Sequence, residues 1–152
     1  MKKIVVLSDT HGNFSAIDKI LPIMKESDYV FHLGDYQRDI FAYRRELNCE
    51  IISVKGNCDG GGQEILTEIE GVKILIVHGD IYGVKCSLDR LYYHAKEIGA
   101  NVVFYGHTHI SGFDEIDGIK LINPGCMNVF SKNSYCYVVI HDKKVTAKVV
   151  YF

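Results

Sequence analysis

The chain has 152 residues, of which 47% are hydrophobic and 24% are charged, and its formal net charge is -2. This length is typical of one domain, which we assign to residues 1–152, and it suffices to bury a core without disulfides or a structural metal. The near-neutral charge excludes the global basic field that recruits long nucleic acid or an anionic membrane surface.

The five cysteines are odd in number and scattered, and no CxxC pair occurs. We recognise no secretory signal ahead of the first apolar run, and no apolar run is long enough to span a bilayer. The sequence therefore predicts a cytoplasmic protein with free thiols and no membrane partner.

Short apolar runs bounded by glycine or polar residues are typical of buried strands, and here they alternate with segments of helical spacing. The predicted strands lie near residues 3–8, 29–33, 50–54, 72–77 and 101–105, and the predicted helices cover 14–26, 38–47 and 86–98. This alternation is typical of βα units with parallel strands.

After His109 the pattern changes to four strand-like runs near 112–116, 119–123, 135–141 and 144–151. Short turns join them, and Asp117-Gly118 is a good hairpin signal. Alternating βα units followed by a β meander predict an α/β fold with two sheets packed face to face and helices outside. This architecture is a four-layer αββα sandwich.

Each of the five strands predicted before His109 runs into side chains that bind metal ions: Asp9 and His11, Asp35, Asn57, His78, and His107 and His109. Strands of one open α/β sheet deliver their C-terminal ends to a common edge, where ligands bind. We therefore expect these seven side chains to converge. Seven oxygen and nitrogen ligands are too many for one ion and suit two.

The spacing within the motifs adds a geometric expectation. Asp9 and His11 are two residues apart, as are His107 and His109, and in extended backbone such residues point the same way. The two oxygens of the Asp35 carboxylate can bridge two ions. Gly79, which follows His78, is expected to let the backbone approach the site closely.

Each motif taken alone has an ordinary structural explanation. Asp9 could cap a helix, Asp35 and Asn57 follow glycines as turn residues often do, and histidines occur by chance in exposed loops. The set favours a metal site, because four of the seven histidines fall in these motifs. The other three lie elsewhere: His32, His94 and His141.

The ordered motifs resemble those of the calcineurin-like metallophosphoesterase superfamily: Asp9-x-His11, Gly34-Asp35, Gly56-Asn57-x-Asp59, His78-Gly79 and Gly106-His107-x-His109. The small size and the form Gly56-Asn57-Cys58-Asp59 resemble its YfcE/MJ0936-type phosphodiesterase family, to which the retromer subunit Vps29 is related in fold. The segments Ser8–Asn13 and Asn123–Gly125 also fit. The chain departs from the family at Asp80, where a second histidine is common, and at Cys126, where serine is common.

The resemblance implies two metal sites that share Asp35. Asp9, His11 and His109 would hold the first metal, and Asn57, His78 and His107 would hold the second. We assign catalytic roles to Asp35, Asn57 and His78. The implied reaction is hydrolysis of a small phosphodiester by a hydroxide that bridges two divalent metals. Manganese is the first expectation, with nickel, iron, cobalt or zinc as alternatives.

A catalytically weak metal-binding scaffold or protein-interaction module of the same fold is the alternative, since the related retromer subunit is a scaffold with incomplete ligands. Every expected ligand is present here, which favours an enzyme. Cys58 is expected to be a small buried residue. Tyr36, Gln37, Arg38 and residues 60–62 are expected to form the rim of the site, and the resemblance implies a homodimer.

Overall fold

Two five-stranded mixed sheets form the centre of the computed structural model, which describes residues 1–128 and 132–152. The first sheet contains β1 (Lys2–Leu7), β2 (Tyr29–His32), β3 (Glu50–Ser53), β9 (Ser134–His141) and β10 (Lys144–Tyr151) in the order β10-β9-β1-β2-β3. The second contains β4 (Glu64–Ile69), β5 (Val72–Val77), β6 (Val102–Phe104), β7 (Gly112–Ile116) and β8 (Ile119–Asn123) in the order β4-β5-β6-β8-β7.

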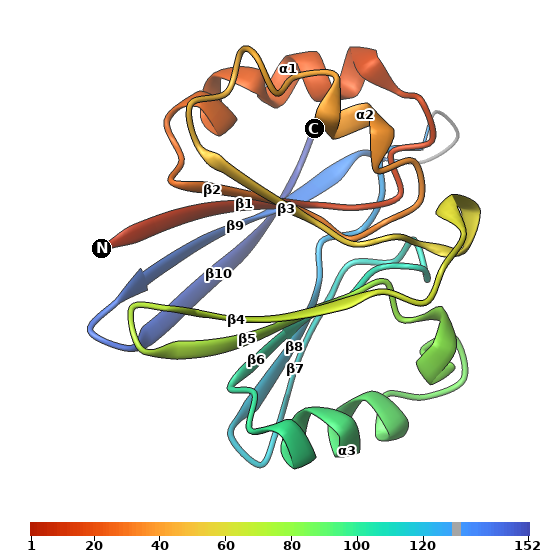
Figure 1. Ribbon diagram of the computed structural model, residues 1–152, viewed down its shortest axis with the longest axis vertical. Helices are drawn as coiled ribbons and strands as arrows, with labels where there is room; N and C mark the ends of the chain where they lie inside the picture. The colour runs from red at the N-terminus through yellow and green to blue at the C-terminus, as the bar shows by residue number, and fades with distance from the viewer. Residues whose placement is uncertain (129–131) are drawn as a thin grey trace.

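The pairing directions make both sheets mixed. In the first sheet β1, β2 and β3 run parallel, with Val5 opposite Val30, while β9 and β10 pair antiparallel. In the second sheet β5, β6 and β8 run parallel, with Leu75 opposite Val103, and β4 and β7 are antiparallel edges. The C-terminal ends of the parallel strands therefore lie at one end of the molecule, at the right of Figure 1.

Helices cover the outer faces of the two sheets (Figure 1). Helices α1 (Phe14–Lys25) and α2 (Arg38–Phe41) lie on the first sheet, and α3 (Asp89–Ile98) lies on the second. Asn13 begins α1 by accepting a hydrogen bond from the Ala16 N–H on its side chain, and Gly99 ends α3 in a left-handed conformation. The predicted four-layer αββα sandwich is confirmed.

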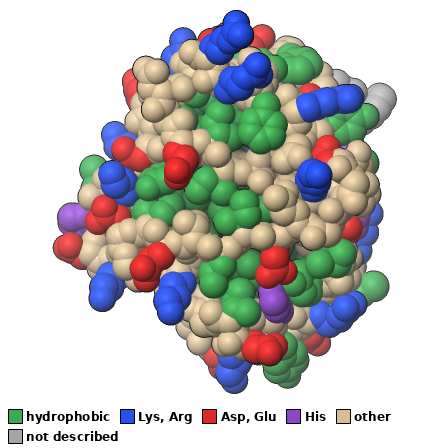
Figure 2. Space-filling view, viewed as in Figure 1, with side chains coloured by type: hydrophobic (Ala, Val, Ile, Leu, Met, Phe, Trp, Pro, Cys, Tyr) green, Lys and Arg blue, Asp and Glu red, His purple; other side chains and the backbone are tan. Residues whose placement is uncertain are grey.

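Three apolar layers hold the sandwich together. The central layer lies between the sheets and includes Phe31 and Phe104, whose ring centroids are 5.9 Å apart. A second layer joins α1 and α2 to the first sheet, and a third joins α3 to the second sheet. Figure 2 shows apolar side chains in a band along one face, in the region of the edge strands β3 and β4. No helix in the described part of the chain is long and apolar enough to cross a bilayer.

Four details of the sequence prediction are wrong. The last four strands do not form one meander, because β7 and β8 join the second sheet while β9 and β10 cross to the first. Strand β4 was missing from the prediction. The predicted helix 38–47 ends at Phe41, because the N–H groups of Tyr43 and Arg44 donate to carbonyl groups three residues earlier, as in turns. Helix α3 begins at Asp89 rather than at residue 86.

Candidate metal centre

The seven predicted ligands meet at one end of the sandwich, in the loops that follow the parallel strands. The loops after β1, β2 and β3 contribute Asp9, His11, Asp35 and Asn57, and the loops after β5 and β6 contribute His78, His107 and His109. The expectation of a single sheet edge is therefore wrong in this detail. Two sheets face each other, and each supplies part of the cluster.

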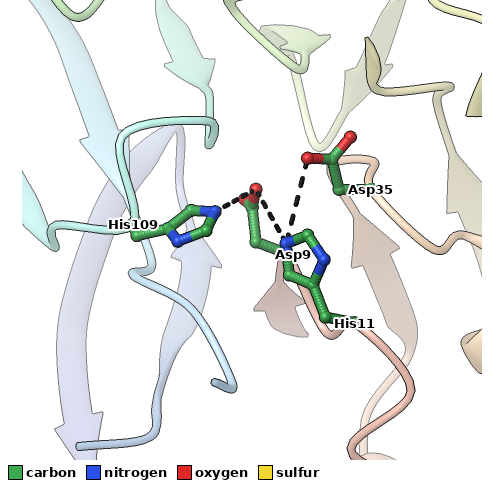
Figure 3. A group of neighbouring side chains, drawn as sticks. All are labelled: Asp9, His11, Asp35 and His109. Atoms are coloured by element: carbon green, nitrogen blue, oxygen red, sulfur yellow. Dashed lines mark ion pairs between the residues drawn. The ribbon is translucent and has the colours of Figure 1, made fainter. Parts of the chain in front are cut away.

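Asp9 is the centre of one half of the cluster (Figure 3). His109 Nε2 lies 3.1 Å from Asp9 Oδ1, and His11 Nε2 lies 4.0 Å from the same oxygen. His11 Nε2 also lies 3.9 Å from Asp35 Oδ2. One ligand atom from each of these four residues lies within 4.8 Å of the others, so they could hold one ion.

His78 is the centre of the other half. Its Nε2 atom lies 2.9 Å from Asn57 Oδ1, 3.2 Å from His107 Nδ1 and 3.5 Å from Asp35 Oδ1. The two oxygens of Asp35 thus face different halves of the cluster, with Oδ2 toward His11 and Oδ1 toward His78. The structure brings all seven side chains together, and their metal-binding and catalytic roles stay predictions.

A backbone contact fixes which ring nitrogen of His78 is available. Its Nδ1 atom lies 2.8 Å from the carbonyl oxygen of Leu33, which can only accept a hydrogen bond. Nδ1 therefore carries the proton and donates, and in the neutral ring Nε2 presents its lone pair to the cluster. This arrangement is typical of histidines that bind a metal through one nitrogen.

The charges of the cluster fit a bound cation. Asp9 is fully buried and Asp35 is 3% exposed, yet within the described residues neither carboxylate pairs with a lysine or arginine. Asp9 Oδ1 and His11 Nε2 are buried and make no well-aligned hydrogen bond. Because buried polar atoms are otherwise nearly always hydrogen-bonded, these two atoms are available to bind a cation.

Protonation in the cluster follows from these contacts. Burial alone would raise the pKa of Asp35, but the adjacent His78 ring and a hydrogen bond from the Cys58 N–H hold this pKa well below its usual range. Burial lowers the pKa of His107, and the neighbouring His78 lowers it further. The close Asp9 carboxylate raises the pKa of His109. Asp35 is therefore ionised at neutral pH.

Left-handed backbone aims the side chains at the cluster. The φ angles are 52° for Asp9, 45° for His11, 70° for His107 and 62° for His109. The expectation of extended backbone at these pairs is therefore wrong. Positive φ costs free energy for residues other than glycine, and such strain is characteristic of functional sites. Of ten such residues in the described chain, five are predicted ligands, the fifth being Asp35.

Glycines let the ligand loops approach one another. A Cβ atom at Gly56 would collide with the Asp35 carboxylate, and one at Gly106 would collide with Ser8 and Asp9. Gly79 differs from the prediction, because its Cβ would meet the side chain of Val84, at 3.0 Å, away from the ligands. The loops therefore approach one another closely at Gly56 and Gly106, which precede Asn57 and His107, and not at Gly79, which follows His78.

Polar side chains that we did not predict hold the loops. Asp39 Oδ2 accepts hydrogen bonds from the Thr10 hydroxyl and the Gly12 N–H, both at 2.7 Å, and so fixes the loop that carries Asp9 and His11. Asp39 is 1% exposed and follows Asp35 by four residues. Its position within a helical segment gave no signal of this role.

Two residues of the recognised motifs act in the same way. Asp59 accepts hydrogen bonds from the N–H groups of Tyr36 (2.9 Å) and Gly56 (3.1 Å), which joins the second and third loops. Asn123 donates to the Gly106 carbonyl (3.2 Å) and to the Thr108 hydroxyl (2.9 Å), which fixes the His107–His109 loop.

Two residues of the predicted rim, Tyr36 and Arg38, lie beside the cluster on the first sheet's side. The Tyr36 ring lies 5.1 Å from the His11 ring, and the Arg38 guanidinium lies 4.8 Å above the Tyr36 ring. The Gln37 amide instead donates a hydrogen bond to the hydroxyl of Ser53, at 3.1 Å.

Cys58 is exposed, so the expectation of a buried residue is wrong. Its N–H reaches Asp35 from the first turn of η1 (Asn57–Asp59), which leaves the thiol outside.

Comparisons with known proteins agree with this geometry. Residues 1–144 match the family model of the calcineurin-like phosphoesterase superfamily domain. A probable metallophosphoesterase of Bacillus subtilis, YsnB, is 32% identical over 95% of this chain and 88% of its own length. The phosphodiesterase MJ0936 of Methanocaldococcus jannaschii is 33% identical over 81% of this chain and 82% of its own length.

Solved structures show the same fold. A predicted phosphoesterase from Streptococcus pneumoniae superposes with a TM-score of 0.80 at 26% identity, over 99% of this chain and 89% of its own. Vps29 of Entamoeba histolytica, solved as a zinc complex, superposes with a TM-score of 0.78 at 18% identity, over 98% of both chains. At 18% identity, the similarity to Vps29 concerns the fold alone.

Proposed function

Since this chain belongs to the calcineurin-like phosphoesterase superfamily, we propose that it is a binuclear metal-dependent phosphodiesterase that hydrolyses a small phosphodiester. One observation carries the proposal most directly: two buried, unsatisfied ligand atoms, Asp9 Oδ1 and His11 Nε2, face a cluster of five further metal-type side chains. Phosphodiesterase names among the relatives support the same reaction class.

The two halves of the cluster are the two proposed sites. Asp9, His11 and His109 would hold one cation, and Asn57, His78 and His107 would hold the other. Asp35 would serve both, because its two oxygens face the two halves. The mixed imidazole, carboxylate and amide donors suit manganese, and they also suit nickel, iron, cobalt or zinc.

When bound, two divalent cations would lower the pKa of an attacking water molecule and offset the negative charge of the phosphate. The chain's own residues prepare the site for this chemistry. The Leu33 carbonyl keeps Nε2 of His78 available, and the Cys58 N–H holds Asp35 in its ionised form. Asp39 and Asp59 fix the loops, so that the ligands need little rearrangement.

The experiment is hydrolysis of bis(p-nitrophenyl) phosphate by chelator-stripped protein before and after manganese is restored. We expect activity only with metal. Asp35→Asn should lower kcat at least about 100-fold and lower the bound metal below two ions per chain, because one shared carboxylate is lost. If Asp35→Asn kept the full rate and the full metal content, the proposal would be wrong.

Asp142→Asn is the matched control. Asp142 lies in the β9–β10 turn, and its side chain is 89% exposed. We expect this variant to keep the wild-type rate and metal content. A folded protein that stays inactive with manganese, nickel, cobalt, iron and zinc would favour the scaffold alternative. The cytoplasmic location and the homodimer stay predictions.

A further inference from the structure

A groove of about 500 Å³ lies beside the candidate metal centre, on the second sheet's side. It is lined by Val84 and Lys85, which follow the 3-10 helix η2 (Asp80–Tyr82), and by Tyr105 and Thr108. The other lining residues lie at or just before the start of β7: Ile110, Ser111, Gly112 and Asp114. Thr108 lies between two predicted ligands, so the groove adjoins the cluster itself.

The groove combines apolar surface with one available cation. Val84 and Tyr105 are buried, at 6% and 5% exposure, while the side chain of Ile110 is exposed. Lys85 is exposed and makes no ion pair with any residue in the described part of the chain. A volume of this size accommodates a small organic ligand, and the wall provides both apolar contact and a charge partner for it.

Two charged side chains of opposite sign line the groove, Lys85 and Asp114. Thr108 lines the same groove and lies between His107 and His109 in the chain, so the groove adjoins the cluster. A substrate whose phosphate lies at the cluster can therefore extend into the groove and place a further anionic group against Lys85.

We propose that this groove binds the organic substituent of the substrate and that Lys85 pairs with a second anionic group on it. The substrate class is then a phosphodiester whose substituent carries a further phosphate or carboxylate. This inference rests on the proposed function, because it concerns the substrate of the same site. Lys85 is a specificity-determining residue, since it lies in the groove and not among the ligands.

The test compares two substrates that differ in one group: p-nitrophenyl phenyl phosphate and p-nitrophenyl 4-carboxyphenyl phosphate. We expect the wild-type protein with manganese to show a KM about 5-fold lower for the carboxylate substrate, the effect of one partly exposed ion pair. Lys85→Gln should remove this preference, so that KM becomes equal for the two substrates. Lys85→Arg should keep it, because the positive charge remains.

A binding measurement separates the two proposals. Calorimetry with phenyl phosphate and 4-carboxyphenyl phosphate should show the same preference in the wild-type protein and none in Lys85→Gln. If neither diester is hydrolysed but this preference is seen, the proposed function fails and the groove assignment stands. Hydrolysis of both diesters without any preference would overturn the groove assignment alone.

Lys19→Gln is the control for a general loss of positive charge. Lys19 is exposed on α1, on the first sheet's side of the sandwich. We expect it to keep the preference, and a loss equal to that of Lys85→Gln would overturn the assignment. An equal slowing of both diesters by Lys85→Gln would also overturn it, because Lys85 would then act on the phosphate common to both.

Discussion

His32 links two ligand loops although it is not itself a predicted ligand. The Gly34 N–H donates to His32 Nδ1 at 3.1 Å, so the proton of the neutral ring lies on Nε2. That nitrogen lies 2.9 Å from the Thr10 hydroxyl, which donates in turn to Asp39 Oδ2 at 2.7 Å. Every group in this chain of hydrogen bonds has a partner only while His32 is neutral. We therefore infer that His32 is a positioning residue.

This network predicts how stability depends on pH. Burial lowers the pKa of His32 from 6.5 to about 4. Below pH 6.5 the unfolded chain binds a proton that the folded chain excludes, so stability is complete above pH 6.5 and falls toward pH 4. The expected loss from His32 is about 3 kcal/mol by pH 4. Urea denaturation of the metal-free protein from pH 7.5 to pH 4 measures it.

Two variants isolate this contribution. His32→Gln should be less stable at pH 7.5, because the network is broken, and should have a flatter pH profile than the wild type between pH 6.5 and pH 4. His141→Gln should have the wild-type profile, since the His141 side chain is 65% exposed. Parallel profiles for the wild type and His32→Gln would show that His32 titrates normally in the folded protein.

Residue types and their order were sufficient to find the side chains that form the cluster, but not the residues that support them. Asp9, Asp35 and His78 each follow an apolar run, which is visible in the sequence. Asp39 and His32 act through contacts between distant loops. A buried histidine inside a strand has the same sequence appearance as one that merely packs, so only the fold distinguishes them.

At the level of elements, strand positions were predictable and loop conformations were not. Apolar runs located β1, β2, β3, β5 and β6 to within a residue or two. Strand β4 is absent from the prediction; in the structure Ile65, Thr67 and Ile69 point inward and alternate with exposed residues that include the apolar Leu66. The left-handed conformations of Asp9 and His107 had none, because tertiary contacts impose them against local preference.

The junction of the β2 and β3 ends gives a second prediction. Gly34 and Gly60 have nearly equal φ angles, 101° and 102°, but a Cβ atom at Gly34 would lie 2.5 Å from the Gly56 nitrogen, whereas one at Gly60 would meet nothing within 4 Å. Gly60→Ala should therefore cost about 1–3 kcal/mol of stability from backbone strain alone. Gly34→Ala should cost a further ~1–3 kcal/mol from overpacking, measured by urea denaturation.

The same pair of variants tests whether this junction positions the ligands. Gly34 precedes Asp35, and Gly56 precedes Asn57, so separating the two loops moves one ligand of each. Gly34→Ala should weaken manganese binding measured by calorimetry, while Gly60→Ala should not. Equal stability losses in the two variants would show that the loops separate freely and that the close packing is not required.

At the level of the whole molecule, the candidate metal centre joins the two sheets at one end of their shared apolar interior. Asp9 lies in the loop after β1 of the first sheet and His109 in the loop after β6 of the second, and their side chains are 3.1 Å apart. The sequence predicted a sandwich and a cluster separately. It did not reveal that the cluster lies between the two sheets, because the sequence does not show which strands belong to which sheet. Strands β9 and β10, at the end of the chain, pair next to β1 in the first sheet.

We therefore predict that metal binding stabilises both sheets at once. Manganese at 100 times its dissociation constant should stabilise the folded protein by about 2.7 kcal/mol and raise Tm by about 5–10 °C. Asp35→Asn should lose most of this rise, and Asp142→Asn should keep it. Hydrogen exchange should slow at the C-terminal ends of β1 and β2 and equally at those of β5 and β6, because ligands come from both sheets. Slowing confined to one sheet would show that the metal is held from one side only, and the cluster would then not connect the sheets.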